Sequence, residues 1–187
     1  MRNVLIVLSG PSGVGKGTIA KQLIQRNKEI SLSISCTTRK PRDGEIDGKD
    51  YFFIGKDEFL SKVEKDGFLE FSNHFENYYG TPKDFVLDKL ATNDVLLEID
   101  VNGGLNVKKS YPKALLIMIT PPSLEELEKR LVNRRTESLE KIKLRMQRID
   151  YELEKSNLYD YTIVNDDLES AIERVEQIIE KEKNIDN

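Results

Sequence analysis

The sequence predicts an α/β fold: a parallel-sheet P-loop core with helices on both faces, a small β-containing insertion and a helical lid. An apolar stretch at residues 4–8 runs directly into a glycine-rich loop, and strand-like and helical stretches then alternate along the 187 residues. Such alternation is typical of a parallel sheet covered by its connecting helices. Residues 36–80, rich in Tyr, Phe and Gly, and the densely charged residues 133–157 interrupt the alternation and indicate the insertion and the lid.

The glycine-rich loop follows G-x-x-x-x-G-K, the Walker A pattern. Its glycines allow positive φ angles, and the first N–H groups of the following helix, together with the lysine, attract a polyphosphate. The loop departs from this pattern at one point: glycine follows the lysine, and the hydroxyl residue comes one position later. The oxygen nearest a metal ion bound with the phosphates is therefore either that hydroxyl or a water molecule. An ordinary strand–turn–helix corner is the disfavoured alternative. The residues expected at the phosphates are Gly10, Pro11, Ser12, Gly13, Val14, Gly15, Lys16, Gly17 and the late hydroxyl Thr18.

The later elements are recognised by apolar spacing and by helix caps. Strands are expected at residues 32–35, 95–99, 115–119 and 161–164, with shorter ones at 51–54 and 68–72 inside the insertion. Thr81 and Pro82 predict an N-cap and a first helical residue, and Ser123 with Glu126 predicts a capping box. An apolar stripe at 168–179 predicts the last helix, and the tail is expected to fray.

Composition limits the classes of function. The formal net charge of −4 argues against broad nucleic-acid binding through simple attraction. The single cysteine, Cys36, excludes an internal disulfide and suits a reducing compartment. We expect neither a signal peptide nor a membrane span, since residues 4–8 are too short for either. The chain is therefore expected to be cytoplasmic, without a nucleic-acid or membrane partner, and its oligomeric state cannot be read from the sequence.

A basic loop follows the expected strand at 32–35. Arg39 and Arg42, held by a proline and a glycine, could grip one phosphate in the bidentate manner that arginine favours. The charged stretch at 133–157 allows two interpretations: a solvated helical face, the usual meaning of such a stretch, or a mobile lid that brings arginines to phosphates.

Several motifs together resemble the guanylate kinase family over nearly the whole chain. They are SGPSGVGKGT, SISCTTRKPRDGEIDGKDYFF, the segment around Glu70, NYYGTP, LLEIDVNGG, PPSLEELEKRL with an arginine three residues further on, and YDYTIVNDDL. The resemblance implies transfer of the γ-phosphoryl group of ATP to GMP, with Mg²⁺, giving ADP and GDP, and acceptance of dGMP is expected. It also implies one domain, with a core at 1–35, 81–124 and 156–187, a GMP-binding part at about 36–80 and a lid at about 125–155.

The resemblance assigns roles residue by residue. It implies Lys16, Arg39, Arg134 and Arg145 as catalytic cations and Asn165 as a contact to adenine. By position, the groups at the GMP phosphate are Arg39, Arg42, Tyr51 and Tyr79, with Glu45 supporting the arginine loop; those at the guanine are Ser35, Glu70 and Thr81, with Asp100 close by. The chain departs from the family pattern at Arg135, Asn102 and Glu98.

Guanine chemistry is consistent with this assignment. The base presents two adjacent donors, N1–H and N2–H₂, and one carboxylate such as Glu70 can accept both. Plainer interpretations remain: Glu70 could be an exposed acid on an edge strand, Tyr51 and Tyr79 could simply pack, and Asp100 could cap a helix.

Three other functions compete. A kinase for AMP, UMP or dTMP would share the phosphate loop, but Ser35, Glu70 and Thr81 suit guanine. A non-catalytic, phosphopeptide-binding module of guanylate-kinase type would usually lack an intact phosphate loop. A P-loop GTPase would need N-K-x-D, whereas the stretch at 184–186 lacks the lysine.

Overall fold

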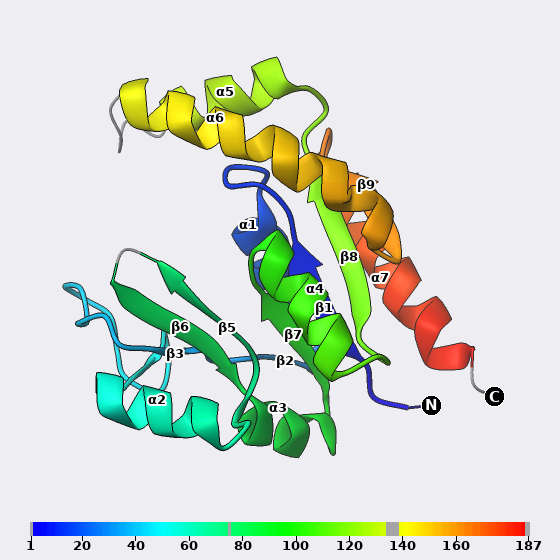
Figure 1. The fold of residues 1–187 in the computed structure, drawn as a ribbon. Helices are drawn as coiled ribbons and strands as arrows, with labels where there is room; N and C mark the ends of the chain where they lie inside the picture. Colours follow the sequence, from blue (N-terminus) through cyan, green and yellow to red (C-terminus); the bar gives the residue numbers. More distant parts are fainter. Residues whose placement is uncertain (1, 75, 134–138, 186–187) are drawn as a thin grey trace.

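Five parallel strands form the central sheet in the computed structural model, which describes residues 2–74, 76–133 and 139–185 (Figure 1). The side chains of His74, Asn133, residues 139–145 and Arg148 are outside that description. The strand order is β2-β7-β1-β8-β9, and every pair is parallel. The strands are β1 (Leu5–Ser9), β2 (Ile30–Leu32), β7 (Asp94–Glu98), β8 (Leu115–Thr120) and β9 (Tyr161–Val164).

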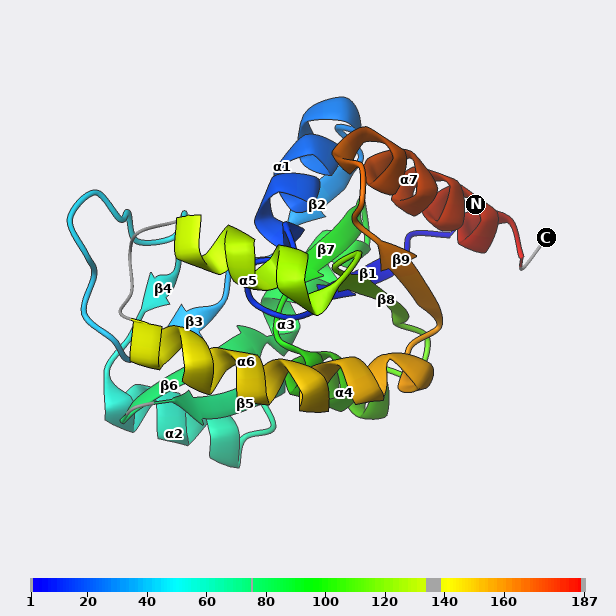
Figure 2. The same cartoon turned by 90° about the horizontal axis from the view of Figure 1, so that it is seen from above.

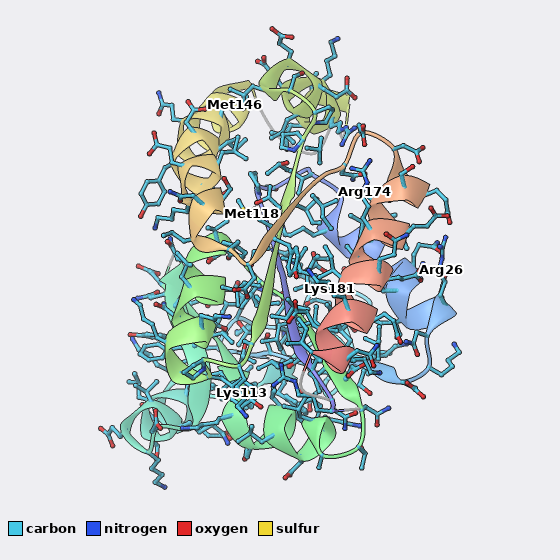
Figure 3. The ribbon with its side chains drawn as sticks, turned by 90° about the vertical axis from the view of Figure 1, so that its right-hand side faces the viewer. Arg26, Lys113, Met118, Met146, Arg174 and Lys181 are labelled. Carbon is cyan, nitrogen blue, oxygen red and sulfur yellow. The ribbon has the colours of Figure 1, made fainter. Side chains whose placement is uncertain are left out.

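Helices cover both faces of this sheet, as the sequence predicts (Figures 1 and 2). Along β1, Ile6 and Leu8 face one core with α1 (Lys16–Arg26) and α7 (Leu168–Asn184). Leu5 and Val7 face the opposite core with α3 (Lys83–Leu90) and α4 (Val101–Ser110). The strand is therefore buried on both sides, which explains why it reads as a nearly continuous apolar run. Figure 3 shows α1 beside α7, where Arg26 donates to Glu169 over 2.6 Å.

The insertion forms a second sheet with the order β4-β3-β6-β5. Its strands are β3 (Cys36–Thr37), β4 (Phe52–Phe53), β5 (Phe68–His74) and β6 (Asn77–Pro82), and α2 (Lys56–Glu64) packs against them (Figure 1). Phe59 of α2 is fully buried and stacks on Phe68, with ring centroids 4.5 Å apart. The aromatic content of this segment thus supplies a small core of its own.

Two helices, α5 (Leu124–Asn133) and α6 (Leu139–Glu154), lie above the carboxyl ends of the central strands, followed by a 3₁₀ turn, η1 (Lys155–Leu158) (Figure 1). The N–H of Glu126 donates to Ser123 Oγ over 3.1 Å, which confirms the serine half of the predicted capping box, while the Glu126 carboxylate accepts from Arg130 at 3.2 Å. Leu131 of α5 and Ile149 of α6 are buried in the core that also contains α1 and α7. None of the helices in the described ranges is long and apolar enough to cross a membrane.

Three local predictions were wrong. The tail, expected to fray from residue 181, is helical as far as Asn184, and Lys183 within it is buried. The strand expected at 32–35 is β2, which ends at Leu32, because the chain leaves its partner β7 there and crosses to the second sheet. Thr81 does not cap α3; Pro82 occupies the cap position, and Thr81 is fully buried in β6 with its hydroxyl bonded to Glu70. A tertiary partner, absent from any local pattern, thus engages the threonine side chain.

A buried ion pair joins the end of α7 to the start of β7. Asp94 is fully buried; it accepts from the N–H of Val4 over 2.8 Å and from Lys183 Nζ over 2.9 Å. Lys183 also reaches the exposed Glu29 at 3.3 Å, so its charge is partly solvated. The Asp94 hydrogen bond raises the pKa of Lys183, which keeps the lysine charged.

We expect Lys183→Met to lower the free energy of unfolding by about 3 kcal/mol, since it leaves a buried carboxylate without its cation. Urea unfolding followed by circular dichroism would measure this. Lys181→Met, a change on the exposed part of the same helix (Figure 3), is the matched control and should have little effect. Equal stability of the two variants would contradict the importance of the pair.

Candidate active site

The glycine-rich loop joins β1 to α1 and exposes the helix N-terminus. Gly15 holds the cap position with φ of 99°, and the first turn of α1 contains no acidic residue, so the positive end of the helix dipole is open to an anion. Asn165 fixes the loop from behind: its Nδ2 donates to the carbonyl of Val14 over 2.7 Å. A Cβ at Gly15 would stand only 2.6 Å from that same nitrogen, so a larger residue there would displace the loop.

A cavity of about 340 Å³ lies over this loop. Lys16 extends along it, with Nζ 2.5 Å from the carbonyl oxygen of Gly10 and 3.0 Å from that of Pro11. The cavity thus combines a cation with the backbone N–H groups of a helix N-terminus, the features that bind phosphate groups. Its lining residues are Ser12, Gly13, Gly15, Lys16, Gly17, Thr18 and Glu98.

Glu98, at the end of β7, faces Gly17, the residue at which the loop departs from the Walker pattern. A Cβ added at Gly17 would lie 3.4 Å from Glu98 Oε1, so the carboxylate stands directly against the start of α1. Thr18 lines the same cavity. A carboxylate and a hydroxyl are oxygen donors of the kind that Mg²⁺ accepts beside phosphates. Within the described ranges, no group of three or more His, Cys, Asp and Glu side chains forms a metal cluster.

A second cavity, of about 190 Å³, lies between the central sheet and the second sheet. Glu98 lines both cavities, so they adjoin at that carboxylate. Both lie at the carboxyl ends of the parallel strands, where β1 has neighbours on each side, the usual ligand position in such sheets. The residues around the second cavity are Ser35, Tyr51, Glu70, Ser72, Tyr79, Gly80, Glu98, Ile99 and Asp100.

Glu70 is the buried carboxylate of the second cavity. It is only 8% exposed, and the Thr81 hydroxyl donates to its Oε1 over 2.6 Å. Burial, reinforced by the negative charge of Asp100, raises the pKa of Glu70 to about 7. The alternative of an exposed edge acid is thereby wrong. A buried acid with few partners in a cavity is a typical recognition group.

Asp100 both caps a helix and lines the second cavity. Its Oδ1 accepts from the N–H of Gly103 over 2.8 Å, so it caps α4, as the plainer interpretation holds. It also lines the second cavity with Glu70. The first turn of α4 approaches Glu70 closely at Gly103, since an added Cβ there would lie only 3.2 Å from Glu70 Oε2.

The basic loop is ordered by a carboxylate. Glu45 receives two hydrogen bonds from the Arg39 guanidinium, both 2.9 Å, and one from the N–H of Arg42 at 2.7 Å. The Arg39 bonds lower the pKa of Glu45 to about 2. The Arg39 guanidinium also lies 5.4 Å from the ring centroid of Tyr51, which in turn packs edge-on against Tyr79. Arg39 is thus positioned at the two tyrosines of the second cavity, while Arg42 is exposed.

If the resemblance to a nucleotide kinase holds, we expect Glu45→Gln to raise the KM for the acceptor that the resemblance implies about tenfold while changing kcat little, because Arg39 loses the charged bidentate partner that orients it. Initial rates at varied acceptor concentration would measure the effect. Asp43→Asn, a change of the same type on the same exposed loop, is the control and should leave KM unchanged. An unaltered KM in Glu45→Gln would refute the supporting role.

The residues expected on the lid fall at the edge of what the structure describes. Arg134 and Arg135 lie outside the described residues, and Arg145 lies in α6 with its side chain outside the description. Their approach to phosphates stays a prediction. Arg130 of α5 is described, and its guanidinium lies 3.4 Å from the carbonyl oxygen of Asn165, next to the phosphate loop.

The structure brings most of the expected acceptor residues into one place. Five of them line the second cavity directly, and Thr81 adjoins it through Glu70. The sequence missed two polar residues of this lining, Glu98, noted only as a family departure, and Ser72. An acidic residue two positions before Asp100 at a strand end was a signal for the first; nothing in the sequence singled out the serine.

The glycine-rich loop at the end of β1 has one cavity over it, and a second cavity with a buried carboxylate and an ordered arginine adjoins it. This arrangement is typical of a P-loop kinase that acts on a small acceptor. Comparison with known proteins narrows the class. Residues 2–182 match the family model described as guanylate kinase. The chain belongs to the guanylate kinase family. It is an ATP:GMP phosphotransferase, which phosphorylates GMP to GDP.

Individual relatives agree with this. A guanylate kinase of Caldanaerobacter subterraneus subsp. tengcongensis is 50% identical over 97% of this chain and 89% of that protein. One of Clostridium acetobutylicum is 45% identical over 97% and 87%. The crystal structure of guanylate kinase from Anaplasma phagocytophilum has a TM-score of 0.77 at 32% identity, covering 98% of this chain and 87% of that one. A shikimate kinase structure from Bacteroides thetaiotaomicron, TM-score 0.54 at 18% identity over 95% and 98%, shares the fold.

Proposed function

We propose that ATP binds with its phosphates over the glycine-rich loop and that GMP binds in the second cavity, so that the two substrates meet beside Glu98. The observation that carries this is the shared lining of the two cavities by that one carboxylate. Residues 10–18 hold the triphosphate, with Lys16 as the central cation. Asn165, which contacts the carbonyl of Val14 behind the loop, extends the site toward the adenine.

Guanine is read by Glu70, with Ser35, Thr81 and Asp100 around it. The ionised Glu70 accepts N1–H and N2–H₂ of guanine together, while its bond from Thr81 fixes the carboxylate plane. Adenine offers an acceptor at N1 and has no 2-amino group, so a buried carboxylate would be left unpaired. That mismatch costs about 1–3 kcal/mol for each lost partner.

The acceptor phosphate is held by Arg39, Arg42, Tyr51 and Tyr79. Arg39 is already oriented by Glu45 and packed on Tyr51. In the reaction the negative charge spreads over the transferred group, so positioning and cations carry the catalysis. Arg134 and Arg145 of the lid, at about 125–155, complete the cationic shell, and the insertion at about 36–80 closes over GMP from the other side to exclude water.

Mg²⁺ accompanies ATP in this proposal. The donor set fits the ion, because the Thr18 hydroxyl and the Glu98 carboxylate line the phosphate cavity together. These residues would hold the ion directly or through its water molecules, and the ion would neutralise the phosphate charge. We also propose that the enzyme acts in the cytoplasm on free nucleotides, without nucleic-acid or membrane partners.

ADP formation from ATP and Mg²⁺, measured against GMP, dGMP, AMP, UMP, CMP and dTMP, tests the base-reading residues. Turnover with GMP and dGMP alone is the expected result. Comparable turnover with AMP or a pyrimidine nucleotide would overturn the roles of Ser35, Glu70 and Thr81. Loss of turnover on removal of Mg²⁺ with a chelator, restored by added Mg²⁺, is expected, and persistent turnover would overturn the metal assignment.

A further inference from the structure

A lysine joins the end of the lid to the acceptor side of the core. Lys155, the first residue of η1 after α6, donates from Nζ to Asn102 Oδ1 over 2.6 Å. Asn102 lies in the first turn of α4. The two residues are 53 positions apart in the sequence, and Figures 1 and 2 both show the end of α6 lying next to α4. The bond therefore connects two elements that otherwise have separate roles.

Helix electrostatics do not explain this placement. An ammonium group is disfavoured at a helix N-terminus, where the dipole is positive. Lys155 is held there by specific partners, the Asn102 amide oxygen and the Tyr151 ring, whose centroid lies 4.1 Å from Nζ. Tyr151 belongs to α6 itself, so the lysine bridges the lid helix and α4.

A second contact attaches the segment after α6 to α4. Four residues after Lys155, the Tyr159 hydroxyl donates to the carbonyl of Val101 over 2.9 Å, and Tyr159 is buried. Gly104 makes room for it, because a Cβ there would collide with the Tyr159 hydroxyl and with Ser9. The buried tyrosine fixes the chain on α4, and the half-buried Lys155 makes its own contact with α4 four residues earlier, on the lid side of this point.

Asn102 also lies close to the residues that line the second cavity. It lies two residues after Asp100, which lines the second cavity, and one residue before Gly103, whose N–H donates to Asp100 and where an added Cβ would lie 3.2 Å from Glu70 Oε2. A nucleotide that engages Glu70 and Asp100 fixes the first turn of α4, and with it the amide that holds Lys155.

We propose that Lys155 is a positioning residue for phosphoryl transfer: by bonding to Asn102 it aligns the lid helix α6 with the occupied GMP site. The inference rests on the proposed lid and GMP-site roles. The lysine does not touch either substrate. It acts through α6, which carries Arg145. By keeping α6 aligned with the acceptor, it reduces the exposure of bound ATP to hydrolysis by water.

Steady-state kinetics of Lys155→Met, Lys155→Arg and Asn102→Ala test the proposal. We expect Lys155→Met and Asn102→Ala each to lower kcat about tenfold, the scale of a small misalignment, with the KM for GMP changed less than about twofold. ATP hydrolysis without GMP should rise relative to transfer. Lys155→Arg should recover most of the activity, and the double variant Lys155→Met/Asn102→Ala should be no worse than either single change.

Lys108→Met is the matched control. Lys108 lies at the other end of α4 and pairs with Asp160 at 2.8 Å, so its loss also removes an ion pair between α4 and the segment after the lid. It should leave kcat unchanged. The proposal would be overturned if Lys108→Met lowered kcat as much as Lys155→Met does, or if kcat were unchanged in Lys155→Met. It would also be overturned if the falls in kcat of the two single changes multiplied in the double variant. Failure of the GMP site itself would appear separately, as a lost preference for GMP in the unmodified enzyme.

Discussion

Lys16→Met should lower kcat at least roughly a hundredfold, the scale seen when one preorganised charge-stabilising donor is removed from an active site. Lys16 is the cation within the phosphate cavity, and its Nζ lies along the loop at the carbonyls of Gly10 and Pro11. The transferred phosphoryl group gains its stabilisation from cations held in place before the reaction. Removing this one therefore raises the barrier itself. ADP release at saturating ATP, GMP and Mg²⁺ would measure the loss.

The fold should survive this change. The apolar residues that anchor α1, among them Ile19 and Leu23, are fully buried and do not involve Lys16. Far-ultraviolet circular dichroism and the unfolding midpoint should therefore match the unmodified protein. Lys21→Met, on the exposed side of the same helix, is the control for loss of charge. Near-normal turnover by a folded Lys16→Met protein would contradict the assignment of the phosphate loop.

Glu70→Gln should lower kcat/KM for GMP by roughly 10²-fold, because glutamine offers one acceptor oxygen where the base needs two, and its NH₂ group opposes a donor of guanine. The pocket should remain intact, since the Thr81 hydroxyl can still donate to the glutamine oxygen. Initial rates with GMP and AMP measure both the loss and the relaxed base choice. An unchanged KM for GMP with unchanged preference would exclude Glu70 from guanine recognition.

The same residue makes GMP use depend on pH. Burial raises the pKa of Glu70 to about 7, and guanine needs the ionised form, so binding at lower pH must first remove a proton. We expect kcat/KM for GMP to rise with pH up to about 7 and then to level off. The phosphate of GMP also titrates near this range, at about pH 6. Glu70→Gln is the control, because its profile retains only the phosphate contribution.

Stability should change in the opposite direction. The carboxyl of Glu70 has its ordinary pKa of 4.5 when the chain is unfolded and about 7 when folded. Its protonated form favours folding, and that contribution is complete below pH 4.5 and lost as pH rises through 7. Glu70→Gln should therefore be more stable than the unmodified protein at pH 8, by roughly 1–3 kcal/mol, and similar to it at pH 5. Equal unfolding midpoints at pH 8 would contradict a buried charge.

Predictions from the sequence succeeded where a local pattern has one physical meaning. The apolar run before Gly10 predicts a buried strand and the glycines after it predict an open loop, and the structure has the buried strand β1 followed by a loop with a cavity over it. The capping serine at 123 likewise acts within four residues. The prediction failed at Thr81, where a hydroxyl suited to a helix cap bonds instead to Glu70 eleven residues earlier. Such a choice depends on strand pairing, which single-residue preferences do not encode.

The sequence by itself determined the fold class and the glycine-rich loop, because these depend on short patterns and on chemistry that each residue carries alone. The acceptor-site residues were predicted only through the resemblance to a family. The tertiary structure decided which of them face one another. Only the packing of β7 against β1 places Glu98 between the two cavities, and only the packing of β5 against β6 and α4 buries Glu70 enough to raise its pKa. Burial and proximity are properties of the folded chain, since they arise from residues far apart along it.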